Sequence, residues 1–115
     1  MLLRASGEAA GEDYDLSVIH GDGSDGGGVP AGVELLAFAD ALLGGDAAAL
    51  DAARAALRAA VGDEGLVDAA GVAATFNAID CIADATGIPL EEAKAAVSQD
   101  FREALNIDGY ADGRV

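Results

Sequence analysis

The residues best placed to perform chemistry are three polar side chains, Asn77, Asp80 and Asp84. Their spacing of three and four residues places them on one face of a helix. Two carboxylates on one face can serve acid–base or metal chemistry, but no histidine accompanies them on this element. A hydrated helix face is the simplest interpretation. The alternative is that the three side chains line a pocket or an oligomer contact, with Asn77 hydrogen-bonded to a neighbouring backbone.

Cys81, the only cysteine, lies beside this polar set. A reactive thiol needs cationic neighbours or a helix N-terminus, whereas Asp80 and Asp84 are negative. We therefore favour a small cysteine that is buried or lies at an interface, and keep a redox thiol as the alternative. Together with Phe76, the three polar residues and Cys81 make up the candidate pocket or interface.

A run of glycine and aspartate follows His20 at residues 21–25. The run faintly resembles a calcium loop, but the later ligands, including the closing glutamate, are missing. A flexible solvated linker is the favoured interpretation. The glycines at 26–28 precede a helix, yet no lysine, serine or threonine follows with the spacing of a phosphate-binding loop. We predict no catalytic residue, no metal site and no cofactor.

The elements that position these residues begin after a flexible arm. Residues 1–31 are rich in glycine and acids and have little apolar surface to offset their ordering entropy. Within them, residues 14–18 alternate apolar and polar side chains, which suits a short extended segment laid on another surface. Residues 32–107 form one helical domain, and residues 108–115 form a polar tail.

The fold class predicted for this domain is all-α, a bundle of about four helices. Glycine stops and aspartate caps delimit the helices. Gly44, Gly62 and Gly87 end the first three, while Asp46 and Asp63 can cap the second and third. The expected helices cover residues 33–43, 46–61, 63–86 and about 89 or 90 to 105. The first should be buried on most sides because only Glu34 and Asp40 are polar.

Composition indicates that the chain does not complete its own core. Of the 115 residues, 28 are alanine, and the expected helices carry about 22 larger apolar side chains. Alanine permits close helix packing but contributes little buried area. We therefore expect self-association through the apolar faces of the first, third and fourth helices. The third carries Val72, Phe76, Ile79 and Ile82 on its apolar sides.

The net charge of −15 bears on partners and location. A negative field repels phosphate backbones and anionic lipid surfaces, so nucleic acid and membranes are unfavourable partners. We see no apolar run near the roughly 20 residues that cross a bilayer, and the N-terminus lacks the pattern of a secretory signal. Because one cysteine cannot form an internal disulfide, a cytoplasmic location is expected.

Three stretches of the domain carry a resemblance to a known family. They read LLAFADAL at 35–42, LVDAAGVAATFNAID at 66–80 and IADATGIPL at 82–90. The stretch 33–107 resembles the C-terminal half of the alkylhydroperoxidase/carboxymuconolactone-decarboxylase superfamily, particularly its peroxidase-related bacterial members. The resemblance implies an alkylhydroperoxidase-like helical bundle.

The departures from that family concern its chemistry. The resemblance implies a Cys-x-x-Cys pair with a nearby glutamate and histidine in the redox members, and a histidine on an ordered element in the decarboxylases. This chain has one cysteine and one histidine, His20, which lies in the expected linker. No catalytic residue of the family can be carried over.

The function predicted from these observations is a non-catalytic interaction module. It forms a homo-oligomer, a dimer or larger, or completes a partner chain of the same superfamily. The alternative is a peroxidase-like or carboxymuconolactone-decarboxylase-like enzyme whose site is assembled across subunits. A second alternative is that the sequence is part of a longer enzyme.

Overall fold

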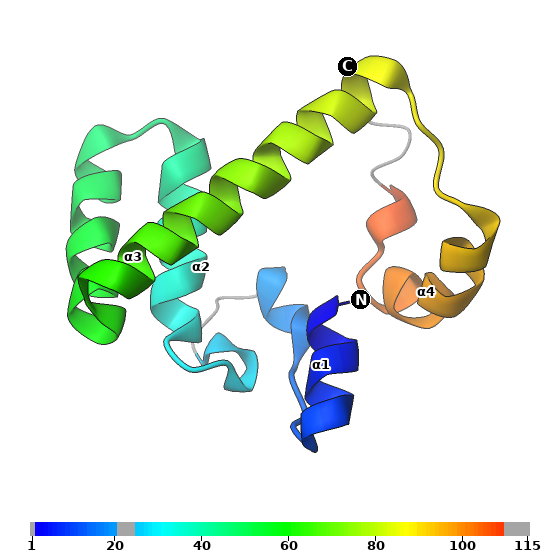
Figure 1. Ribbon diagram of the computed structural model, residues 1–115, viewed down its shortest axis with the longest axis horizontal. Coiled ribbons are helices and arrows are strands. Elements are labelled where there is room, and N and C mark those ends of the chain that lie inside the picture. The colour runs from blue at the N-terminus through cyan, green and yellow to red at the C-terminus, as the bar shows by residue number, and fades with distance from the viewer. Residues whose placement is uncertain (1, 21–24, 110–115) are drawn as a thin grey trace.

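The computed structural model of the chain describes residues 2–20 and 25–109. Within these residues it is all-α, with helices α1 (Leu2–Ala10), α2 (Gly32–Gly44), α3 (Ala47–Thr86) and α4 (Glu92–Ala104) and no strand. Two short 3₁₀ helices, η1 (Leu16–Ile19) and η2 (Gly26–Gly28), lie between α1 and α2. In Figure 1, α2 packs beside the start of α3, and the rest of α3 leads across the molecule toward α4. The predicted all-α fold of about four helices is confirmed.

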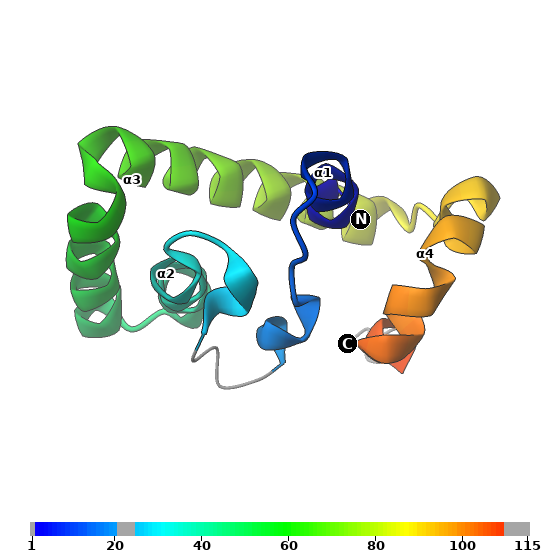
Figure 2. The same ribbon diagram turned by 90° about the horizontal axis from the view of Figure 1, so that it is seen from below.

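Helix α3 bends sharply at Gly62, so that it consists of two helical segments. Gly62 adopts φ 78° and ψ −179°, outside the helical region, in a conformation that only glycine adopts readily. Figure 2 shows the chain turning at this point from one direction into another. We call residues 47–61 the first segment of α3 and residues 63–86 the second segment. The prediction of two helices separated at Gly62 is confirmed.

Most helix ends follow the predicted signals. The Asp46 side chain accepts hydrogen bonds from the amides of Ala48 and Ala49, at 2.9 and 3.3 Å, and so caps α3. Gly45 and Gly87 adopt left-handed conformations after α2 and α3. Helix α4 begins at Glu92, later than predicted, because Glu91 is its N-cap and residues 88–91 are not helical.

The core is small and lies where α2 packs on the first segment of α3. It contains Phe38, Ala53 and the fully buried Leu57, with Leu50 and Val61 partly buried against them. Leu50, Ala53, Leu57 and Val61 recur at intervals of three and four residues, a spacing that predicts one apolar face for residues 46–61, and Phe38 of α2 packs against that face. The expectation that the first helix is buried on most sides is wrong: only Gly32 and Phe38 of α2 are buried. The reason is that α2 packs chiefly on α3 and on η2.

The segment before α2 is more structured than the sequence indicated. Residues 14–18 were expected to be extended, but η1 covers Leu16–Ile19 and the Asp15 side chain caps it. Gly26 and Gly27 are buried, and a Cβ on Gly32 would lie 2.3 Å from the Gly26 carbonyl oxygen. Glycine therefore permits a close backbone approach here. The flexibility of residues 1–31 stays a prediction, and residues 21–24 of that arm lie outside the described residues. Residues 110–115 of the predicted polar tail also lie outside them.

The molecule is open for its size. Its radius of gyration is 15.4 Å, whereas a compact chain of this length has about 13 Å. Its accessible surface is 8155 Å², against about 5,700 Å² for a compact monomer of 11.3 kDa. The chain thus exposes about 2,400 Å² more than a compact monomer would.

Candidate functional site: an exposed apolar stripe and an alanine groove

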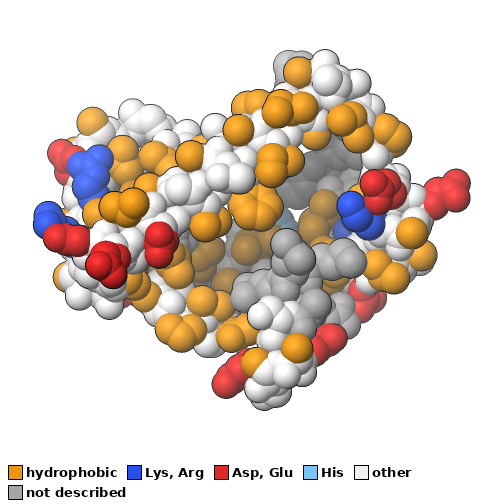
Figure 3. Space-filling model, in the orientation of Figure 1, with side chains coloured by type: hydrophobic (Ala, Val, Ile, Leu, Met, Phe, Trp, Pro, Cys, Tyr) orange, Lys and Arg blue, Asp and Glu red, His pale blue; other side chains and the backbone are white. Residues whose placement is uncertain are grey.

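The second segment of α3 presents a row of large apolar side chains to solvent. Val72, Phe76, Ile79 and Ile82 are 58, 54, 53 and 60% exposed. Their spacing of four, three and three residues places them on one side of the helix. Figure 3 shows hydrophobic side chains gathered along this helix. We call these four residues the α3 stripe.

The stripe is exposed because α2 covers only the beginning of the second segment. Leu66, Ala69 and Ala70 pack against the core, but beyond them the helix leads away from α2 (Figure 2). Helix α4 does not cover it either, because the four stripe residues are more than half exposed with α4 in place. Exposed large apolar side chains in such a row mark interaction sites more often than scattered ones do.

The predicted polar residues share the second segment with the stripe. Asn77, Asp80 and Asp84 are exposed, so the structure brings them to one face of the helix but not into an enclosed pocket of this chain. A hydrated face matches this placement. Their role in an oligomer contact stays a prediction.

The two remaining candidates, Phe76 and Cys81, lie on different sides of this helix. Phe76 belongs to the stripe, and Cys81, five residues later, points elsewhere. The Cys81 thiol is free and exposed. Burial of Cys81 inside the chain, one of the two favoured interpretations, is therefore wrong, because none of the described elements covers this residue of α3. A place at an interface with another chain stays a prediction.

His20, at the end of η1, is hydrogen-bonded to the end of α4. Its Nε2 atom lies 2.7 Å from the carbonyl oxygen of Leu105, which accepts the hydrogen bond.

Nearby in the sequence, Asp13, Asp15 and Asp25 line a polar hollow of about 410 Å³. The hydrogen bond from Ser17 lowers the pKa of Asp15. Among the described residues, no group of three or more His, Cys, Asp or Glu side chains has the arrangement of a metal site; residues 21–24 of the predicted loop lie outside them.

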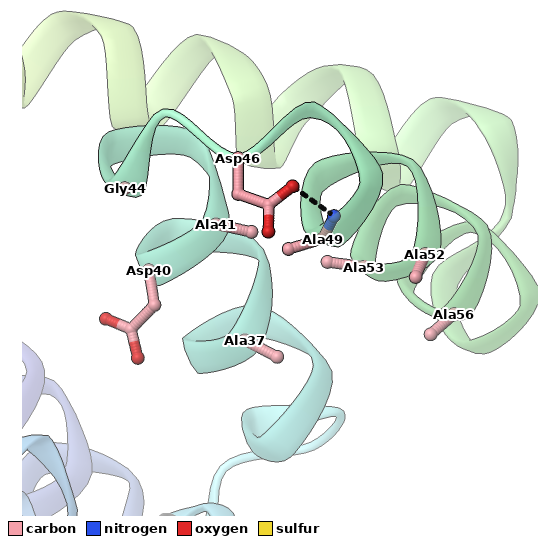
Figure 4. A pocket seen from close by; sticks show the side chains of 9 residues that line it. All are labelled: Ala37, Asp40, Ala41, Gly44, Asp46, Ala49, Ala52, Ala53 and Ala56. Carbon is pink, nitrogen blue, oxygen red and sulfur yellow. Dashed lines mark hydrogen bonds between the residues drawn. The ribbon is translucent and has the colours of Figure 1, made fainter.

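A groove of about 650 Å³ lies between α2 and the first segment of α3. It is lined mainly by alanines, as Figure 4 shows: Ala37 and Ala41 of α2, and Ala49, Ala52, Ala53 and Ala56 of α3. Asp46 lies at one end, turned toward the Ala49 amide that it caps (Figure 4). Single methyl groups leave the space between the two helices unfilled. We call this feature the alanine groove.

Sequence reasoning missed the alanine groove as a feature. The signal that could have revealed it is the spacing of Ala49, Ala52, Ala53 and Ala56, which recur at intervals of three, one and three residues. That pattern marks one helix face. The composition indicated only that alanine-rich faces permit close packing.

An ion pair spans the bend that separates groove from stripe. The Asp63 carboxylate accepts a hydrogen bond from Arg58 Nε, and the two side chains lie on opposite sides of Gly62. The hydrogen bond and the opposite charge lower the pKa of Asp63 and raise that of Arg58. Both side chains are exposed, so solvent weakens their attraction. The pair thus bridges the two segments of α3 across the bend.

One described helix, α3, is long and apolar enough to cross a membrane by length and composition. Its most apolar 18-residue window has a mean hydropathy of 1.4, and none of that window is buried. The expectation that no such stretch exists is therefore corrected. The second segment nevertheless carries Asp68, Asp80 and Asp84, and each charge near a bilayer centre costs about 2.5–3.5 kcal/mol. The exclusion of a membrane stays a prediction.

Comparison with known proteins supplies no identification. No family model matches the chain, and neither the curated proteins nor the solved structures include a significant match. The features of the chain that bear on its function are the α3 stripe, the alanine groove and the exposed area.

Proposed function

We propose that the chain is a non-catalytic all-α module that self-associates or completes a partner chain of the same superfamily. The observation that supports the proposal is the α3 stripe, four large apolar side chains that are each more than half exposed. In the proposal the stripe is the contact surface. We also propose that residues 33–107 are related to the C-terminal half of the superfamily they resemble, the alkylhydroperoxidase/carboxymuconolactone-decarboxylase superfamily.

The excess exposed area of the chain can be compared with the area that homodimer interfaces bury. The chain exposes about 2,400 Å² more than a compact monomer would. Obligate homodimers bury about 2,000–5,000 Å² in total, which is about 1,000–2,500 Å² from each protomer. The excess area is thus large enough to supply an obligate interface.

The test compares two aspartate substitutions on the same helix. Phe76→Asp places a charge in the middle of the stripe and should weaken self-association at least about 30-fold, the effect of losing a central contact of about 2 kcal/mol. Val67→Asp is the matched control, because Val67 is 69% exposed and lies five residues before Val72, on a different side of the helix.

Size-exclusion chromatography with light scattering reports the mass of each variant, and circular dichroism reports its helix content. The proposal expects a helical monomer for Phe76→Asp and the wild-type mass for Val67→Asp. A wild-type chain that is monomeric contradicts self-association, and a Phe76→Asp variant that keeps the wild-type mass contradicts the assignment of the contact to the stripe.

A further inference from the structure

We infer that the occupant of the alanine groove is the α3 stripe of a second copy of this chain, and that two copies exchange these contacts reciprocally. The inference rests on the proposed self-association and specifies which surfaces meet. It joins two exposed apolar features of the described residues, one built from large side chains and one from methyl groups.

The two surfaces complement each other in shape. The stripe presents Phe76 and three β-branched side chains that project from a helix. The groove offers about 650 Å³ of space along a wall of alanines. Large side chains of one helix fill the spaces between small side chains of its neighbours in close-packed interfaces.

The groove is about two thirds as long as the stripe. From Val72 to Ile82 the stripe extends about 15 Å along its helix, at about 1.5 Å per residue. On the same scale the groove extends about 10 Å along α3, from Ala49 to Ala56. Two or three large side chains of the stripe can therefore lie in the groove at once.

The stripe of a chain does not reach the groove of the same chain. The bend at Gly62 directs the second segment away from the first, and in Figure 4 that segment passes behind the groove rather than over its opening. All four stripe residues stay more than half exposed. A second copy is needed to bring the two surfaces together.

Reciprocal exchange gives a closed assembly. In a two-fold dimer each copy supplies one stripe and one groove, so the stripe–groove contact forms twice and neither surface is left over. The excess exposed area of about 2,400 Å² per chain lies within the about 1,000–2,500 Å² that each protomer of an obligate dimer buries, and the stripe and the groove are parts of that exposed surface. A contact between two stripes alone would leave both grooves open.

Disulfide cross-linking distinguishes these arrangements. In a Cys81→Ser background, Ile79→Cys labels the stripe and Ala52→Cys labels the groove; both positions are exposed. Ala55→Cys is the matched control, because Ala55 is an exposed alanine of the same segment that does not line the groove. Variants are co-expressed in pairs, oxidised and separated on non-reducing gels.

The inference expects a heterodimeric cross-link for the Ile79→Cys and Ala52→Cys pair, several-fold stronger than for the Ile79→Cys and Ala55→Cys pair. Ile79→Cys that cross-links mainly to itself shows that the stripes pair with each other, which overturns the inference and leaves the proposed self-association standing. A monomeric mass for the unsubstituted chain overturns both. Pelleting of that chain with phosphatidylcholine vesicles assigns the stripe to a lipid surface and also overturns the inference.

Discussion

Replacing Gly62 with alanine should destabilise the fold by about 1–3 kcal/mol, the cost of holding a non-glycine residue in a backbone region that is essentially restricted to glycine. Gly62 has φ 78° and ψ −179°. A Cβ atom at this position would meet nothing within 4 Å. The cost therefore comes from the backbone conformation and not from a steric clash with a neighbour.

Straightening α3 does not avoid this cost. A continuous helix from Ala47 to Thr86 would relieve the strain at residue 62 but carry the second segment away from α2. Leu66, Ala69 and Ala70, which pack against the core, would then lose part of their burial. Either response lowers the free energy of unfolding.

Gly71→Ala is the matched control. Gly71 lies within the second segment, where a Cβ also meets nothing within 4 Å, and its φ is not in the left-handed region. Alanine should stabilise the helix there by up to about 1 kcal/mol. The two glycine-to-alanine substitutions should thus differ by about 2–4 kcal/mol, with opposite signs.

Urea denaturation followed by circular dichroism measures both effects. All chains are compared at one protein concentration, because self-association raises the apparent stability. If Gly62→Ala stabilises the chain as much as Gly71→Ala does, then α3 is one continuous helix and the reasoning from the bend is refuted.

Three further predictions concern the core, the ion pair and the net charge. Leu57→Ala should lower the free energy of unfolding by about 2–5 kcal/mol in thermal or urea denaturation, since Leu57 is fully buried. The control Leu43→Ala, at a 71% exposed position, should change the free energy of unfolding by less than about 0.5 kcal/mol. Because Arg58 lowers the pKa of Asp63 below its ordinary 3.8, the pair stabilises the fold at neutral pH and this small contribution is lost as the pH falls through the lowered pKa. Arg58→Gln should return the Asp63 pKa toward its ordinary value in an NMR titration, and an unchanged titration contradicts the pairing. Self-association should strengthen as NaCl is raised from about 0.05 to 1 M, because the Debye length falls below about 10 Å and salt screens the repulsion between chains of charge −15. Self-association that weakens with salt in sedimentation experiments would show instead that attractive charge pairs hold the interface.

The helices were predictable because their signals are local. Asp46, Gly62 and Gly87 act within one turn of the chain, and the structure shows a cap, a bend and a left-handed stop at these positions. The buried Leu57 followed from helical periodicity in the same way. Such features depend on neighbours four residues away or fewer.

The features that escaped prediction depend on tertiary placement. The 3₁₀ helix at Leu16–Ile19 occurs where alternating apolar residues indicated an extended segment, and the local hydrogen bond from Ser17 to Asp15 decides the outcome. The exposure of α2 and of Cys81 depends on how little of the chain packs over them. The alanine groove depends on which faces of α2 and α3 meet, and spacing within one helix does not determine that pairing.

Sedimentation velocity of the unsubstituted chain at low micromolar concentration measures the self-association on which the proposed function depends. We expect a dimer or larger assembly, because the α3 stripe and an excess of about 2,400 Å² remain exposed in a single copy. A folded monomer that persists across the concentration range, with the helix content of the native chain, would contradict it.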